Sequence, residues 1–157
     1  MKLLPLVGGL FAQVDTHWFD YLMQWNWYAQ KGRHTYYVMR IETIDKKSKK
    51  IYMHRIIMAT PPDLLVDHQD GNGLNCLEEN MRNCSKSQNG MNRITMRGAS
   101  QFLGVWCRRG GFEAEIKVDG KKKRLGHFKI EEDAARAYDK AAKQFHKEFA
   151  HLNFPEK

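Results

Sequence analysis

The first part of the chain, to about residue 92, mixes short apolar runs with turn signals, which predicts several short strands. Strands are expected at residues 10–14, 36–44, 51–58, 64–68 and 81–84. Apolar residues at helix-compatible steps predict one helix within residues 16–27, through Trp18, Tyr21, Leu22 and Trp25. A small domain needs large buried apolar groups, so the core is expected to include Trp18, Trp25 and Trp27.

From Phe102 onward the pattern changes. Gly110-Gly111 and Asp119-Gly120 separate three strand-like runs, which predicts hairpins joining residues 102–108, 112–118 and 122–128. An alanine-rich stripe then predicts a helix over residues 131–147 that lies close against the sheet. Residues 91–101 are polar, include Arg93 and Arg97, and have the composition of a linker. The predicted fold class is α+β, with domains at 1–95 and 101–156.

Composition narrows the classes of partner. Lys and Arg number 26 and Asp and Glu 18 among 157 residues, a formal charge of +8. This charge favours a polyanionic partner, although many soluble proteins are basic. No segment approaches 18 continuous apolar residues, so a membrane partner is not expected. Nothing in the sequence indicates an obligate protein partner.

The three cysteines predict a reducing environment. Cys76, Cys84 and Cys107 form no CxxC pair and no even disulfide framework, which favours free thiols in a cytoplasmic setting. Cys76 and Cys84 flank the polar motif described next. No second Cys or His pair has the spacing to complete a tetrahedral site, so structural zinc is not favoured.

A spaced set of four polar residues, Asp67, His68, Asn80 and Asn89, carries the strongest chemical signal. A histidine with a pKa near neutrality can deprotonate water, and a carbonyl oxygen bonded to its other ring nitrogen fixes the tautomer. A carboxylate and a side-chain amide are ligands that suit magnesium. Alone, an Asp-His pair is usually a turn or a strand end. Together, the four residues suggest phosphodiester hydrolysis.

The local pattern predicts that these residues meet. The strand at 64–68 ends at Asp67-His68, and the turn signals Asp70-Gly71 and Asn72-Gly73 follow. After the strand at 81–84, Ser85 and Gln88 have the spacing of a capping box, so a helix carrying Asn89 is expected to start there. Strand, loop, strand and helix would bring the Asp-His pair and Asn89 together.

Residues 66–68, 80–82 and 87–89 resemble the HNH endonuclease motif, most closely that of phage homing endonucleases. The resemblance covers residues 1–95 and implies a ββα-metal fold that cuts double-stranded DNA site-specifically inside a bacterial host cell. It implies that Asp67 and Asn89 bind a divalent metal, Mg²⁺ or Mn²⁺, that His68 is the general base, and that Asn80 orients His68. The family often has a His-Arg pair upstream, where Arg55 would hold a phosphate and His54 is expected to be packed.

Residues 101–156 resemble the plant ethylene-response-factor (APETALA-type) DNA-binding domain, through motifs at 102–105, 114–117, 124–128, 132–139 and 152–155. That family reads the DNA major groove with a three-stranded sheet. The resemblance places six residues on the DNA-facing side: Trp106, Arg108, Glu115, Lys117, Lys122 and Arg124. Alternation along strands agrees, and residues 103–129 contain eight Lys and Arg against three Asp and Glu.

Two other functions stay open from sequence alone. The first is a DNA-binding regulator with an inactive HNH remnant, which the intact four-residue set argues against. The second is a nuclease acting on RNA. It is weaker because a sheet fits the major groove of B-form DNA, whereas the RNA major groove is too narrow for side chains to read.

Overall fold

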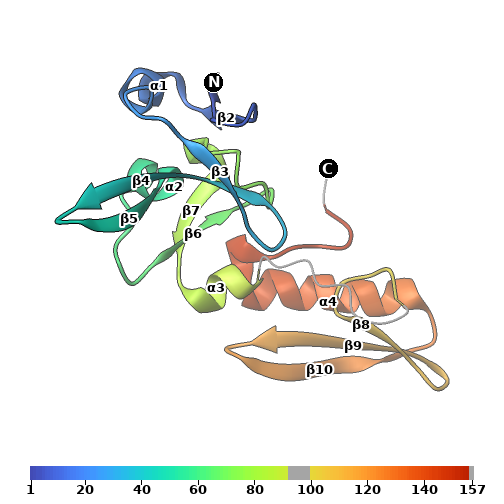
Figure 1. The fold of residues 1–157 in the computed structure, drawn as a ribbon. Coiled ribbons are helices and arrows are strands. Elements are labelled where there is room, and N and C mark those ends of the chain that lie inside the picture. Colours follow the sequence, from blue (N-terminus) through green and yellow to red (C-terminus); the bar gives the residue numbers. More distant parts are fainter. Residues whose placement is uncertain (92–99, 156–157) are drawn as a thin grey trace. The chain divides into compact units, whose positions relative to one another are not determined.

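The computed structural model describes residues 1–91 and 100–155, which fold into short antiparallel sheets and four α-helices. Two compact units, Met1–Ser85 and Lys86–Lys157, make up the chain (Figure 1). The division falls earlier than the predicted domain limits at residues 95 and 101. Arg93 and Arg97 of the predicted linker lie outside the described residues. No helix in the described ranges is long and apolar enough to cross a membrane.

The first unit contains three small sheets and two short helices. One sheet is a hairpin of β1 (Lys2–Pro5) and β2 (Phe11–Val14), and helix α1 (Thr16–Leu22) follows it. The second has the order β3-β4-β5, from β3 (Tyr28–Lys31), β4 (Tyr36–Ile44) and β5 (Lys47–Tyr52). After α2 (Met53–Ile57), the third pairs β6 (Leu65–His68) with β7 (Met81–Cys84), which the 3₁₀ helix η1 (Glu78–Asn80) precedes.

The core of this unit forms around Trp27, which is 1% exposed and donates its indole N–H to Leu22 O at 2.8 Å. Trp18 and Trp25 are partly buried against the same cluster. The prediction that the tryptophans belong to the core is therefore confirmed. Strands and helices from the whole unit supply the other buried members, among them Leu4, Ala12, Val14, Val38, Met53 and Met81.

The prediction of one continuous strand over residues 51–58 is wrong. The strand ends at Tyr52, and residues 53–57 form α2. Met53 and Ile57 are both buried. Their spacing of four places them on one face of the helix. In so short a run, burial of that face against the core decides between helix and strand. The helix predicted within residues 16–27 is also shorter, because α1 ends at Leu22.

The second unit opens with α3 (Lys86–Met91) and continues as a three-stranded antiparallel sheet and a long helix. The sheet has the order β8-β9-β10, from β8 (Val105–Arg108), β9 (Gly111–Val118) and β10 (Lys121–Phe128). Helix α4 (Glu131–Phe145) covers one face, and the 3₁₀ helix η2 (Lys147–Phe149) follows. A sheet packed on one helix is what the sequence predicted for this part.

Small side chains let α4 approach the sheet closely. Ala134 and Ala135 are fully buried against Val105 and Ala114, as the alanine stripe predicted. Gly104 shows how tight the contact is, because a Cβ at this position would overlap the Tyr138 ring, and its φ of +69° also favours glycine. Because α4 packs on this face, it does not cover the opposite face of the sheet.

Candidate active site and DNA-facing sheet

Asp67 and His68 are the last two residues of β6, and the antiparallel ladder pairs them with Arg82 and Met81 of β7. Both side chains are buried, with exposures of 4% for Asp67 and 6% for His68. Asn80 is also buried, and its carbonyl accepts a hydrogen bond from the Gln69 N–H at 2.8 Å. Three of the four predicted site residues therefore lie together at one end of the β6–β7 pair.

Arg82 forms an ion pair with Asp67. Its Nε and Nη2 donate to Asp67 Oδ2 at 2.9 and 2.7 Å. Two charge-assisted hydrogen bonds from one guanidinium fix the orientation of the carboxylate. The sequence analysis did not select Arg82, although its place directly opposite Asp67 follows from the strand register.

The side chain of Asn80 bonds to the loop that follows His68. Its Nδ2 donates to Asp70 Oδ1 at 3.0 Å and to Asn75 O at 2.9 Å, while its Oδ1 accepts from the Asp70 N–H at 3.2 Å. These bonds join Asn80 to the loop and not to the imidazole. The role of Asn80 in orienting His68 stays a prediction.

Asp70, which the sequence indicated only as part of a turn, lies in the loop that follows His68. Its carboxylate also accepts from Asn72 N–H and from Asn75 Nδ2, each at 2.8 Å. Burial raises the pKa of Asp70, but these hydrogen bonds together with that from Asn80 outweigh the burial, and the net pKa is lowered. The loop thus presents a stable negative charge close to His68.

The N-terminal strands hold this loop in place. Gln13 of β2 donates its N–H to Leu74 O and accepts from the Cys76 N–H, both at 2.9 Å. The Gly73 N–H donates to Thr35 Oγ1 at 3.0 Å, and a Cβ at Gly73 would overlap Tyr36 O. A larger residue cannot occupy Gly73 without displacing β4, so the loop and the sheet determine each other's position.

The His68 ring contacts two other rings of an aromatic cluster. The ring centroid of His54 lies 5.3 Å away, edge-on, and that of Tyr37 lies 6.0 Å away. Tyr52 stacks on His54 at 5.4 Å, with 21° between the ring planes. His54 is therefore a packed histidine, as the sequence favoured, and the cluster limits access of water to His68.

Burial keeps both imidazoles neutral at pH 7. It lowers the pKa of His54 to about 3, with further lowering by the neighbouring His68 and Arg55. Burial also lowers the pKa of His68, against the opposing influence of the Asp70 and Asp67 carboxylates. A neutral imidazole is the form that accepts a proton, so His68 is in the protonation state that a general base requires.

Arg55 already has structural partners. Its guanidinium donates to the carbonyls of Leu64, Pro61 and Thr60 at 2.9, 2.7 and 3.3 Å. These bonds hold the connection between α2 and β6. Phosphate binding by Arg55 stays a prediction. It would use guanidinium N–H groups that do not take part in these three bonds.

The remaining predicted metal ligand, Asn89, lies on α3 of the second unit, as the capping pattern predicted for its helix. Within residues 1–91 and 100–155, no group of three or more His, Cys, Asp or Glu side chains is placed to hold a metal ion. Burial raises the pKa of the Cys76 thiol to about 12, which disfavours the thiolate that zinc binds. An Asp and Asn oxygen pair, as predicted, would suit a hard metal ion that retains water ligands.

The chain is similar to an uncharacterised HNH endonuclease of Acanthamoeba polyphaga mimivirus. The two sequences are 27% identical over 152 residues, which cover 92% of this chain and 75% of the viral protein. No protein-family profile matches the chain, and no solved structure matches it. The similarity thus extends over the residues of both units.

All six residues predicted to face DNA lie on the sheet face opposite α4. Residues at the alternate positions, such as Val105, Ala114 and Ile116, pack towards the helix. The cross-strand register brings the six close together: Trp106 is opposite Glu113, Lys117 is opposite Lys122, and Glu115 is opposite Arg124. Between Arg124 and Gly126 the register shifts by one residue, which lets Leu125 pack in the core.

Glu113 joins this face as a residue that sequence reasoning missed. Its carboxylate contacts Arg124 Nε at 2.8 Å and Arg108 Nε at 3.9 Å, and it is only 16% exposed. The neighbouring Glu115 contacts Lys122 Nζ at 2.7 Å. Lys122 and Arg108 also lie over the Trp106 ring, at 5.5 and 5.7 Å from its centre. The cationic side chains are therefore held in place by acidic and aromatic neighbours.

Proposed function

We propose that this protein is a metal-dependent, site-specific DNA endonuclease of the HNH type. The observation that carries the proposal is the buried, neutral His68 beside the ion-paired Asp67 at the end of β6. Nuclease function in general is supported by the distant viral relative named as an HNH endonuclease. A nuclease substrate also fits a chain of formal charge +8.

In the proposed reaction His68 accepts a proton from a water molecule as that water attacks the scissile phosphorus. The bond from phosphorus to the 3′ oxygen breaks in line with the attack, which leaves a 5′-phosphate and, after protonation, a 3′-hydroxyl. The aromatic cluster of Tyr37, Tyr52 and His54 keeps bulk water away from the imidazole. The loop held by Asn80 fixes Asp70 close to the same ring, where its charge stabilises the imidazolium that forms.

Asp67 and Asn89 are the residues that would hold the metal, Mg²⁺ or Mn²⁺. A bound divalent ion would supply stabilisation of the negative charge that develops on the phosphate and the departing oxygen. The ion pair with Arg82 fits this role, because it fixes the orientation of the Asp67 carboxylate before a metal binds. Oxygen ligands from a carboxylate and an amide are of the type that magnesium prefers.

The sheet of the second unit is proposed to select the DNA sequence, as its resemblance to ethylene-response-factor domains implies. Arg108 and Arg124 have the fork of donors that reads guanine edges, whereas Lys122 and Lys117 suit phosphates. Trp106 offers an apolar surface among these cations. The uncovered face would therefore meet the major groove of duplex DNA with both base-reading and phosphate-binding groups.

One observation favours a second candidate, a DNA-binding regulator whose nuclease site is inactive. Two donors of Arg82 bind Asp67 Oδ2, one of the two carboxylate oxygens that could otherwise bind a metal. If this ion pair persists when DNA and metal are present, Asp67 would serve only the fold. The intact set of Asp67, His68, Asn80 and Asn89 argues for the enzyme.

Relaxation of supercoiled plasmid in the presence of Mg²⁺ tests the proposal. The wild-type protein is expected to cut, and His68→Ala to lose at least about a hundredfold in rate while it binds DNA as before, because a general base contributes this much. A wild-type protein that binds DNA without cutting would establish the regulator. Cleavage by His68→Ala at the wild-type rate would rule out the proposed base.

A further inference from the structure

The β4–β5 hairpin extends beyond the sheet to which it belongs. The pairing of β3 with β4 ends at Tyr28 and Met39, whereas β4 and β5 stay paired from Met39 to Ile44. From Arg40 to the turn, these two strands therefore form a two-stranded ribbon, residues 40–51, which Figure 1 shows running out from the first unit. Asp45 and Lys46 have φ of 49° and 62°, the positive values of a type I′ turn that closes the ribbon tightly.

The tip of the ribbon is strongly basic. Four exposed lysines lie within five residues, at Lys46, Lys47, Lys49 and Lys50. Acidic residues on the ribbon are Glu42 and Asp45, and Glu42 already contacts Arg40 Nη1 at 3.2 Å. The lysines are thus available to an external anion, and their density gives the tip a positive charge of its own.

Apolar residues accompany the lysines. Ile41 is 56% exposed and Ile44 is 52% exposed. Ile41 lies opposite Lys50, and Ile44 lies opposite Lys47, so each face of the ribbon has an isoleucine beside a lysine. Exposed isoleucines beside lysines suit a surface that contacts DNA sugars and thymine methyl groups as well as phosphates.

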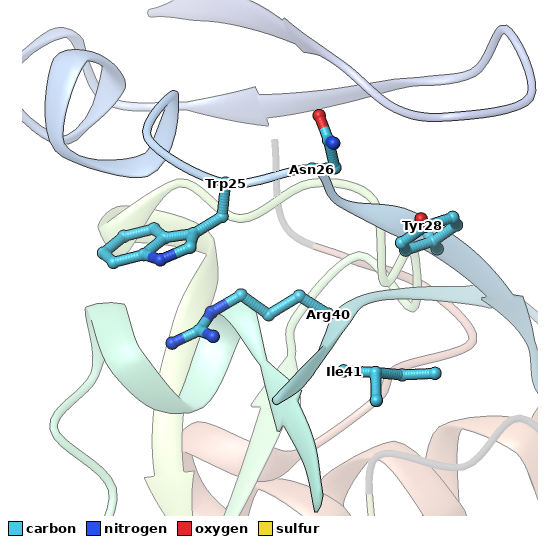
Figure 2. A pocket seen from close by; sticks show the side chains of 5 residues that line it. All are labelled: Trp25, Asn26, Tyr28, Arg40 and Ile41. Carbon is cyan, nitrogen blue, oxygen red and sulfur yellow. The ribbon is translucent and has the colours of Figure 1, made fainter. Parts of the chain in front are cut away.

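The root of the ribbon is anchored to the core. The Arg40 guanidinium lies 4.6 Å from the Trp25 ring centre and 5.9 Å from that of Trp27. Figure 2 shows Arg40 turned towards Trp25, in a pocket that Asn26, Tyr28 and Ile41 also line. This anchor restricts the swing of the hairpin, so little conformational freedom is lost when the ribbon binds a partner.

We propose that the β4–β5 ribbon is a second DNA-binding element, which enters the major groove of the substrate duplex. A two-stranded β-ribbon has the dimensions of that groove. Lysines of the turn and of β5 would neutralise phosphates along the groove, and Ile41 and Ile44 of β4 would contact sugars and thymine methyl groups. The inference rests on the proposed DNA substrate. The ribbon would give the first unit a DNA contact of its own, in addition to that of the sheet in the second unit.

Affinity of the full chain for duplex DNA as a function of salt tests the ribbon. Lys47→Gln together with Lys49→Gln removes two proposed phosphate contacts. The slope of log K against log salt should fall by about 1.8, and binding at ~0.1 M salt should weaken roughly tenfold or more. The control is Lys140→Gln with Lys143→Gln, which removes the same charge from exposed positions of α4. Equal slopes for the ribbon variant and this control would overturn the proposal.

Two serine substitutions separate groove contact from charge alone. Ile41→Ser with Ile44→Ser should weaken binding several-fold and leave the salt slope unchanged, because no charge is removed. Both residues are exposed, so the fold should survive, which circular dichroism checks. Unchanged affinity would overturn the groove contact.

Plasmid cleavage distinguishes failure of the ribbon from failure of the proposed function. A wild-type protein that cuts DNA, beside a ribbon variant that binds like the control, rejects the ribbon alone. A wild-type protein that binds no duplex DNA rejects both.

Discussion

Arg82 donates to Asp67 Oδ2 from Nε at 2.9 Å and from Nη2 at 2.7 Å, across the β6–β7 pair. Both residues are largely buried, with side-chain exposures of 5% for Asp67 and 18% for Arg82. Removing one partner of such a pair leaves the other charge buried without compensation. The interaction therefore affects both the stability of the first unit and the orientation of Asp67, the proposed metal ligand.

Arg82→Gln is expected to lower the free energy of unfolding by about 3 kcal/mol, the usual cost of breaking a buried ion pair. Urea unfolding measures this change. Arg33→Gln is the matched control, because Arg33 is exposed and its loss should change stability by less than about 0.5 kcal/mol. Equal stability of the two variants would show that the Asp67–Arg82 pair contributes nothing to the fold.

Cleavage should depend on a divalent metal through Asp67. Excess EDTA is expected to stop plasmid cleavage, and added Mg²⁺ or Mn²⁺ to restore it. Asp67→Ala should behave as the chelated wild type does, even with metal present. Activity that persists in excess EDTA would exclude the proposed metal-dependent reaction, whatever the effect of the substitution.

The pH profile of cleavage should reflect the lowered pKa of His68. Because burial lowers this pKa below 6.5, the imidazole stays neutral and able to accept a proton at pH values where an exposed histidine is already charged. The acidic limb of the cleavage rate should therefore lie below pH 6.5. A rate that falls through half its maximum above pH 6.5 would contradict a buried, neutral base.

Stability should fall with acidification because of His54. Its pKa is about 3 in the folded protein and 6.5 when exposed, so between these values the unfolded chain binds the extra proton. The contribution is complete above pH 6.5 and is lost as pH falls towards 3, by up to about 1.4 kcal/mol per pH unit. Urea unfolding at several pH values should show a shallower dependence for His54→Gln than for the wild type. Parallel curves would mean that His54 is not buried.

Glu113 is expected to lower the affinity of the sheet for DNA in general and to raise its selectivity for the target sequence. Glu113→Gln removes the carboxylate that holds Arg124 at 2.8 Å and Arg108 at 3.9 Å, and it removes a negative charge that would face phosphates. Affinity for random duplexes should therefore rise, and discrimination of the target should fall by about 1–3 kcal/mol, the usual value of one well-placed arginine. Arg124→Ala should lower discrimination to a similar extent without raising random affinity. Unchanged selectivity in Glu113→Gln would show that the arginines need no such support.

Local sequence pattern determined much of both units. The strand at residues 81–84 and that ending at Asp67-His68 have the predicted positions, and so does the helix that carries Asn89. Turn signals, apolar alternation and capping residues act over a few neighbours, and these are interactions that a sequence displays directly. The same alternation correctly placed Trp106 with Arg108, and Lys122 with Arg124, on one face of their strands.

Only the tertiary structure decided which partners these residues have. Arg82 and Glu113 received no role from the sequence, because their ion pairs depend on strand register and on side-chain position across strands. The loop that Asn80 holds depends on Gln13, a residue of a distant strand. Residues 53–57 became a helix because the core buries Met53 and Ile57, a long-range effect that overrides local strand propensity. Sequence alone thus determined most of the elements and the candidate residues, whereas burial and cross-strand contacts decided residues 53–57 and the orientations of the candidate site residues.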